Sequence, residues 1–119
     1  MTNKYNIKRG EIRKIGKELS QKLSPLGLEP DEIVFFGSRV KGRAKPTSDL
    51  DVVVIPRNKP WESPREYTTL MENVKKHTKD IKYKGNSLDL QVVSTFTEAE
   101  SGFCYEKLKR GKITKKCSL

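Results

Sequence analysis

The sequence has few cysteines, few aromatic residues and no long apolar run. Its 119 residues include two cysteines and one histidine, and only 8% of them are aromatic. No segment approaches the roughly 18 consecutive apolar residues that cross a bilayer, which argues against a membrane protein. The start of the chain also lacks the apolar run of a signal peptide. Because the two cysteines have no framework spacing, we expect a cytoplasmic protein in which the thiols of Cys104 and Cys117 are reduced.

Positive charge is what the sequence has in excess. Lysine and arginine number 25 against 15 aspartate and glutamate residues, which gives a formal net charge of +10. This balance favours an anionic partner, which could be a nucleotide, a nucleic acid or an acidic protein surface. The basic residues are dispersed along the chain, however, and solvated surface charge explains the excess equally well. Charge alone therefore does not identify a function.

The apolar pattern predicts one domain over residues 1–119, in which helices and strands alternate. We expect helices over residues 7–24, 39–43, 63–78 and 98–110, and strands over residues 33–36, 50–55 and 87–94. Ser63, Pro64 and Glu66 are typical of a helix start, and Gly111 is typical of a helix end. Residues from about 112 to 119 have the composition of a basic tail. The expected fold is a small sheet with helices packed against it, in the α/β or α+β class.

Acidic residues occur in two of the predicted strands. Asp49 and Asp51 flank Leu50 where an apolar strand begins, and Asp89 alternates with leucines in the last predicted strand. Because side chains alternate along a strand, the acids point to one face and the leucines to the other. If the two strands are neighbours, the three carboxylates meet on one open face. Oxygen ligands of this kind favour Mg²⁺ or Mn²⁺ over Zn²⁺.

Each acid also has a simpler explanation. Asp49 follows Thr47 and Ser48 and is compatible with a turn or a cap, and Asp89 is compatible with ordinary strand polarity. Asp51 is harder to explain in this way, because an unpaired carboxylate beside buried valines costs several kcal/mol. The shared pattern of the two strands favours a metal site over three separate accidents.

A Gly-Ser pair follows the first predicted strand and precedes a short predicted helix. Gly37 lets a phosphate approach the backbone, while Ser38 and the amides of a helix start supply hydrogen-bond donors. Arg39 is the basic residue closest to this turn, so we expect it to neutralise phosphate charge. Gly-Ser pairs also occur in ordinary turns, and the basic residues that follow are compatible with a solvated helix face. Together with the acids, the pair predicts a site for a metal-bound nucleoside triphosphate (NTP).

The segment from Phe36 to Asp51 resembles the signature of the DNA polymerase beta-like nucleotidyltransferase superfamily. Ten residues separate Ser38 from Asp49, which is the spacing of the minimal nucleotidyltransferases (MNT). The resemblance implies a mixed sheet with helices on one face. It also implies transfer of a nucleoside monophosphate (NMP) from an NTP, with ATP as the expected donor and pyrophosphate as the product.

The resemblance further implies roles for individual residues. Gly37 and Ser38 would bind the triphosphate, and Asp49 and Asp51 would hold Mg²⁺. Asp89 matches the third carboxylate of the family, so it is expected to join the metal site and to help activate the incoming hydroxyl.

Three functions are compatible with these residues. The leading hypothesis is a transferase that adenylylates a partner protein, because many MNT proteins resemble antitoxins of helical HEPN-type toxins. The second is a partner-binding subunit without catalysis. The third is a nucleotidyltransferase directed at nucleic acid, which the charge favours but the scarcity of aromatic residues for base stacking disfavours.

Overall fold

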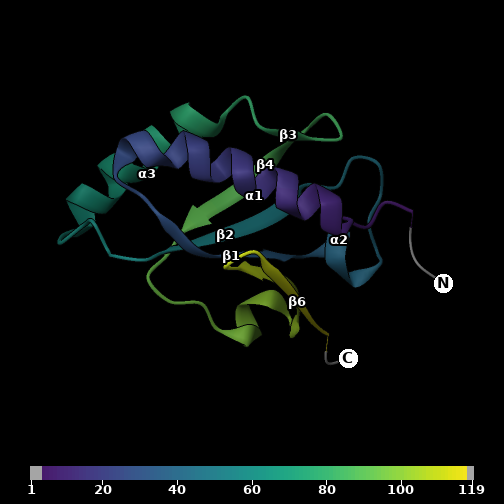
Figure 1. Cartoon of the computed structure of the whole chain (residues 1–119). Helices are drawn as coiled ribbons and strands as arrows, with labels where there is room; N and C mark the ends of the chain where they lie inside the picture. The colour runs from purple at the N-terminus through teal and green to yellow at the C-terminus, as the bar shows by residue number, and fades with distance from the viewer. Residues whose placement is uncertain (1–3, 118–119) are drawn as a thin grey trace.

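A six-stranded mixed sheet forms the centre of the computed structural model, which describes residues 4–117 (Figure 1). β2 and β4 run parallel, and the other neighbouring strands are antiparallel. The order across the sheet is β3-β4-β2-β1-β5-β6. The strands are β1 (Pro30–Phe36), β2 (Leu50–Pro56), β3 (Lys82–Tyr83), β4 (Asn86–Val92), β5 (Cys104–Lys109) and β6 (Lys112–Cys117). The mixed α/β architecture is the one that the sequence predicts.

Two long helices, α1 (Arg9–Leu23) and α3 (Pro64–Thr78), cover one face of this sheet (Figure 1). In α1, apolar residues recur every three or four positions and are buried against the strands. In α3, the Ser63 hydroxyl accepts a hydrogen bond from the Glu66 amide at 3.2 Å, so this helix begins as predicted. The short α2 (Ser38–Lys41) connects β1 to β2. No helix within residues 4–117 is both long enough and apolar enough to cross a membrane.

The two faces of the sheet carry different side chains. On the face under α1 and α3, residues such as Phe35, Val52 and Val54 belong to the main core. Burial of each such side chain stabilises the fold by about 1.5–3 kcal/mol. On the opposite face, Val34 and Val53 form a smaller cluster with residues of β5 and of the loop after β4. That loop contains the 3₁₀ helix η2 (Glu98–Ser101) and covers only part of the face (Figure 1).

The C-terminal region corrects two predictions. Residues 98–110 are not a helix, because only η2 is helical and β5 follows it. Gly102 and Phe103 adopt φ values of 64° and 61°, which end the helical turn. Arg110 and Gly111 also have positive φ, 51° and 77°, and form the two-residue turn of a β5–β6 hairpin. The predicted basic tail is therefore wrong over residues 112–117, which form the edge strand β6, and residues 118–119 lie outside the described residues.

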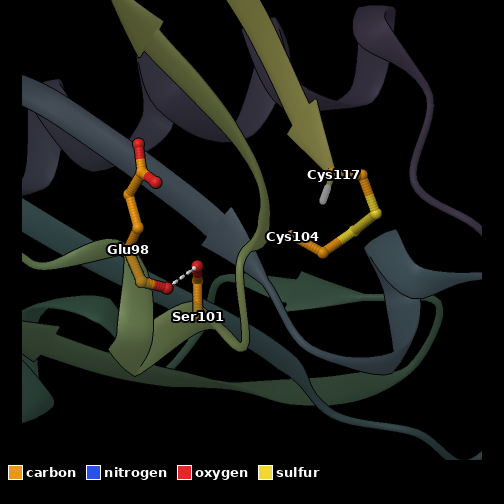
Figure 2. Close-up of a disulfide and its surroundings, with 4 residues drawn as sticks. All are labelled: Glu98, Ser101, Cys104 and Cys117. Carbon is orange, nitrogen blue, oxygen red and sulfur yellow. Dashed lines mark hydrogen bonds between the residues drawn. A yellow bond between two sulfur atoms is a disulfide. The ribbon is translucent and has the colours of Figure 1, made fainter. Parts of the chain in front are cut away.

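A disulfide between Cys104 and Cys117 corrects the expectation of two reduced thiols (Figure 2). The two residues are direct neighbours in the β5–β6 register, with Cα atoms 3.9 Å apart. The hairpin brings them together, whereas a helix over residues 98–110 would have kept them apart. Beside the disulfide, the Ser101 hydroxyl donates to the Glu98 carbonyl at 2.6 Å (Figure 2). The paired cysteines remove the basis on which a cytoplasmic location was expected.

Candidate active site

Asp51 and Asp89 lie side by side on the face of the sheet opposite α1 and α3. The parallel register of β2 and β4 pairs Asp51 with Asp89 directly. The neighbouring Leu50 and Val52 point to the other face, where both are fully buried. Asp51 is half-buried and Asp89 is exposed. The two acidic strands are thus neighbours, as expected, and their alternation brings these two carboxylates onto one open face.

The Asp51 carboxyl titrates unusually for an aspartate. Burial is the main reason that the pKa of Asp51 is raised to about 6. A hydrogen bond with Asp89 and the negative charges of Asp89 and Asp49 act on the pKa in the same direction. Two carboxylates in hydrogen-bonding contact cannot both ionise at low cost, so the pair favours a shared proton or a bound cation.

Asp49 stands beside this pair without joining it. It precedes β2 and is exposed, and its charge acts on Asp51. Within residues 4–117, no three side chains of His, Cys, Asp or Glu are close enough together to hold a metal ion. The described side chains therefore do not form a three-carboxylate ligand set as they stand. The donor chemistry nevertheless fits Mg²⁺, because paired carboxylate oxygens need positive charge between them.

Gly37 lies directly against the Asp51 carboxylate. Its backbone adopts φ 83° and ψ −161°, a conformation that residues with a side chain rarely take. A Cβ atom at this position would meet the Asp51 Oδ2 atom at 2.0 Å. Glycine is therefore required both by the backbone and by the neighbouring carboxylate. This contact joins the Gly-Ser turn and the acidic pair into one site.

Ser38 follows Gly37 and begins α2. The amides of Val40 and Lys41 both donate to the Gly37 carbonyl at 3.0 Å, which closes the helical turn. The first N–H groups of a helix have no partner within the helix, and in α2 these are the N–H groups of Ser38 and Arg39. The half-buried Ser38 side chain is adjacent to them. These groups are the donors that the structure offers to an anion at this turn.

Arg39 is buried and binds the chain itself, and its contact with a phosphate stays a prediction. Its side chain is 0% exposed. The Nε and Nη2 groups donate to the Ser48 carbonyl at 3.2 and 2.9 Å, and Nη2 also donates to the Pro46 carbonyl at 3.1 Å. Nη1 donates to the Tyr5 carbonyl at 3.0 Å. Arg39 therefore holds the segment that leads directly into Asp49.

Tyr83 extends this buried network. The Arg39 guanidinium lies 5.1 Å from the centre of the Tyr83 ring, and the Tyr83 hydroxyl donates to Glu11 Oε1 at 3.1 Å. Burial, with the hydrogen bond to Glu11, raises the pKa of Tyr83 above that of an ordinary tyrosine. The network connects α1, α2 and β3 with the segment before Asp49. Sequence reasoning missed it because nothing local distinguishes Arg39 from the exposed basic residues that follow.

Comparison with known protein families identifies the class to which this site belongs. A family model of the nucleotidyltransferase domain matches residues 12–117. The chain therefore belongs to the nucleotidyltransferase domain family. Membership supports transfer of an NMP group from an NTP substrate as its general activity. A search of curated proteins finds no match.

Proposed function

We propose that this chain transfers an NMP group, with ATP as the donor, to a hydroxyl group of a partner protein. The main support is the contact between the Gly37 turn and the Asp51–Asp89 pair on an open face of the sheet. A triphosphate at the turn lies next to the acids, and an acceptor has access from the open face. Family membership supports the reaction type.

Each residue of the site has a separate role in the proposed reaction. Asp51, Asp89 and Asp49 would hold Mg²⁺ or Mn²⁺, which neutralises charge on the triphosphate when bound. Gly37 lets the triphosphate approach the main chain, and Ser38 donates hydrogen bonds to its oxygens. Asp89 is the more exposed carboxylate of the pair and accepts the proton of the acceptor hydroxyl. The acceptor oxygen forms a bond to the α-phosphorus while the bond from that phosphorus to the bridging oxygen breaks, and pyrophosphate leaves.

The surface favours a protein acceptor over a single-stranded nucleic acid. Binding of single strands without sequence preference relies on exposed aromatic side chains that stack on bases. Among residues 4–117, Phe103 is the only large hydrophobic side chain that is exposed, at 49%. Phe36, Phe96 and Tyr105 pack against one another instead, with ring centres 5.8 and 6.3 Å apart. An acidic protein surface complements the net charge of +10 and needs no aromatic side chains for stacking.

The resemblance to MNT proteins supports a role as the antitoxin of a HEPN-type toxin. A transferred AMP group adds bulk and negative charge to its acceptor. Both changes oppose the binding of nucleic acid at a cleavage site, because phosphates repel an added phosphate. Modification of the toxin would therefore silence it.

A label-transfer experiment tests this proposal. The purified chain and its Asp49→Ala/Asp51→Ala variant are incubated with Mg²⁺, each α-labelled NTP in turn, and lysate of the source organism. We expect label from ATP on one protease-sensitive band, absent with the variant. Nuclease-sensitive label would instead establish a nucleic-acid acceptor. Capture of a partner without label would establish a binding subunit without catalysis.

A further inference from the structure

The outer edge of β4 is open beside Asp89. β3 is the outermost strand, but it pairs only with Asn86 and Ser87 at the start of β4. In the described part of the chain, no strand pairs with the outer side of β4 from Leu88 onward. An unpaired edge presents a row of main-chain donors and acceptors to which another chain can pair.

The main-chain groups of Leu88 and Leu90 point toward this open edge. The Val93 amide donates to a β2 carbonyl at 3.0 Å, so the odd-numbered residues of β4 direct their N–H and C=O groups toward β2. The even-numbered residues therefore direct theirs outward. Tyr67 of α3 confirms this direction, because its hydroxyl donates to the Val92 carbonyl at 2.6 Å. The Val92 carbonyl is thus occupied, while Leu88 and Leu90 have no strand partner on that side within residues 4–117.

A basic hollow follows the same edge. It has a volume of about 300 Å³ and is lined by Leu88, Asp89 and Leu90 together with lysines of α3 and of the segment that follows it. These are Lys75, Lys79 and Lys82, all exposed. The two leucines are half-buried and supply apolar surface between the lysines and the strand. The hollow thus offers apolar contact, open hydrogen-bonding groups and positive charge to a ligand.

We propose that this edge is the docking site of the acceptor, which rests on the function proposed above. An extended, acidic segment of the partner protein pairs antiparallel with β4 as an additional strand, and its acceptor side chain lies opposite Asp89. Because Leu88 and Leu90 make the hydrogen bonds, Asp89 occupies a non-hydrogen-bonded position, where opposed Cα atoms are only about 4.5 Å apart. The acceptor hydroxyl then lies on the same face as Asp89. Its two neighbours in the segment point to the other face, toward the lysines of the hollow.

A peptide titration followed by NMR tests the docking site directly. The probe is a nine-residue peptide with a central tyrosine, a glutamate on each side of it, and threonine and valine beyond. Added to ¹⁵N-labelled protein without NTP, it is expected to shift the amide signals of Leu88 and Leu90. Its matched control carries N-methyl groups on the two glutamates, which removes the donors that face β4, and is expected to cause no such shift. Shifts confined to another surface, or equal shifts with the methylated peptide, would overturn the docking site.

Variants of the chain test the same edge through the rate of NMP transfer to this peptide. Leu90→Pro removes an outward N–H group and leaves the hydrogen bonds to β2 intact, whereas Leu90→Ala retains the N–H group. We expect Leu90→Pro to lower kcat/KM by about tenfold or more and Leu90→Ala to have a smaller effect. Lys75→Glu/Lys79→Glu is expected to lower it too, and Lys76→Glu, on the same helix but outside the hollow, is not. The lysine variants keep the test decisive if the proline variant does not fold.

The outcomes separate the docking site from the proposed function. If the peptide shifts the β4 signals but receives no NMP from any NTP, the docking site stands and the function fails. If transfer occurs at the same rate with Leu90→Pro and with Lys75→Glu/Lys79→Glu as with the unchanged chain, the function stands and the docking site fails.

Discussion

Replacement of Gly37 by alanine is expected to inactivate the site by displacing Asp51. The new Cβ atom would lie 2.0 Å from Asp51 Oδ2, on a backbone with φ 83°. With ψ −161° this backbone lies outside the αL region, in a region that essentially only glycine adopts, which costs an alanine about 1–3 kcal/mol, and the overpacked contact costs about 1–3 kcal/mol more. The variant should therefore lose about 2–6 kcal/mol of unfolding free energy in urea. Since misplacement of a reacting group by about 1 Å costs about 100-fold in rate, transfer should fall by at least that factor.

Gly27→Ala is the matched control for this prediction. Gly27 also has a positive φ, 76°, although its ψ of 14° places it in the αL region, and an added Cβ atom would meet nothing within 4 Å. The Gly27→Ala variant should lose only about 1–2 kcal/mol of unfolding free energy, which is the cost of the left-handed backbone, and it should retain full activity. Removal of the opposing carboxylate in Gly37→Ala/Asp51→Ala should recover part of the lost stability while the chain stays inactive. If Gly37→Ala matches Gly27→Ala in both stability and rate, the contact between Gly37 and Asp51 does not exist in solution.

Three further predictions follow from the same region. Asp51 destabilises the folded chain once it is ionised. Because its pKa is raised from 3.8 to about 6 in the folded chain, the unfolding free energy falls as the pH rises through about 6. Asp51→Asn should therefore stabilise the metal-free chain by about 1–3 kcal/mol at pH 8 and by little at pH 4, measured by urea unfolding with a chelator. Arg39→Lys should leave at least one of the three carbonyls that Arg39 binds without a partner, lower the melting temperature and slow transfer, because a compact ammonium does not reproduce the planar fork that spans them. An unchanged melting temperature would contradict this. Reduction of the Cys104–Cys117 bond should lower the unfolding free energy by about 2–3 kcal/mol, and equal urea midpoints with and without reductant would refute it.

The long helices and the strands β1, β2 and β4 were predictable because each has its own apolar pattern, whereas the two-residue β3 was not predicted. The start of α3 is an example, since the Ser63 side chain and the Glu66 amide interact within one turn. The positions of Asp51 and Asp89 were predictable for the same reason, because alternation alone directs both to one face. Their pairing needed only the further assumption that the two strands are neighbours.

The C-terminal hairpin was not predictable in this way, because a charged residue interrupts its pattern. β5 places Cys104, Glu106 and Leu108 on the helix-covered face, and Glu106 is only 6% exposed. Burial raises the pKa of Glu106, which shows that this carboxyl pays a desolvation cost that a core position normally avoids. A buried glutamate hides the alternation that would indicate a strand. Without that alternation, Gly111 has the pattern of a helix end.

Two features of the site depend on register and burial between distant segments. The contact of Gly37 with Asp51 exists because β1 and β2 pair Phe36 with Asp51, which no local pattern reports. The burial of Arg39 depends on carbonyls from two other segments and on the ring of Tyr83. Such features follow from tertiary packing, so a reading of local sequence assigns these residues their type of chemistry but not their partners.

The parallel pairing of β2 with β4 also determines when the site comes into existence during folding. A parallel pair needs a crossover, and here α3 lies between the two strands in the chain. Asp51 and Asp89 can therefore pair only once α3 has crossed over, although the antiparallel pairing of β1 with β2 already holds Asp51 beside Gly37. Contacts between segments so distant in sequence form slowly. A chain still leaving the ribosome, or one opened locally at β4, would carry its Gly-Ser turn but only half of its acidic pair, so catalytic competence and completed folding would arrive together.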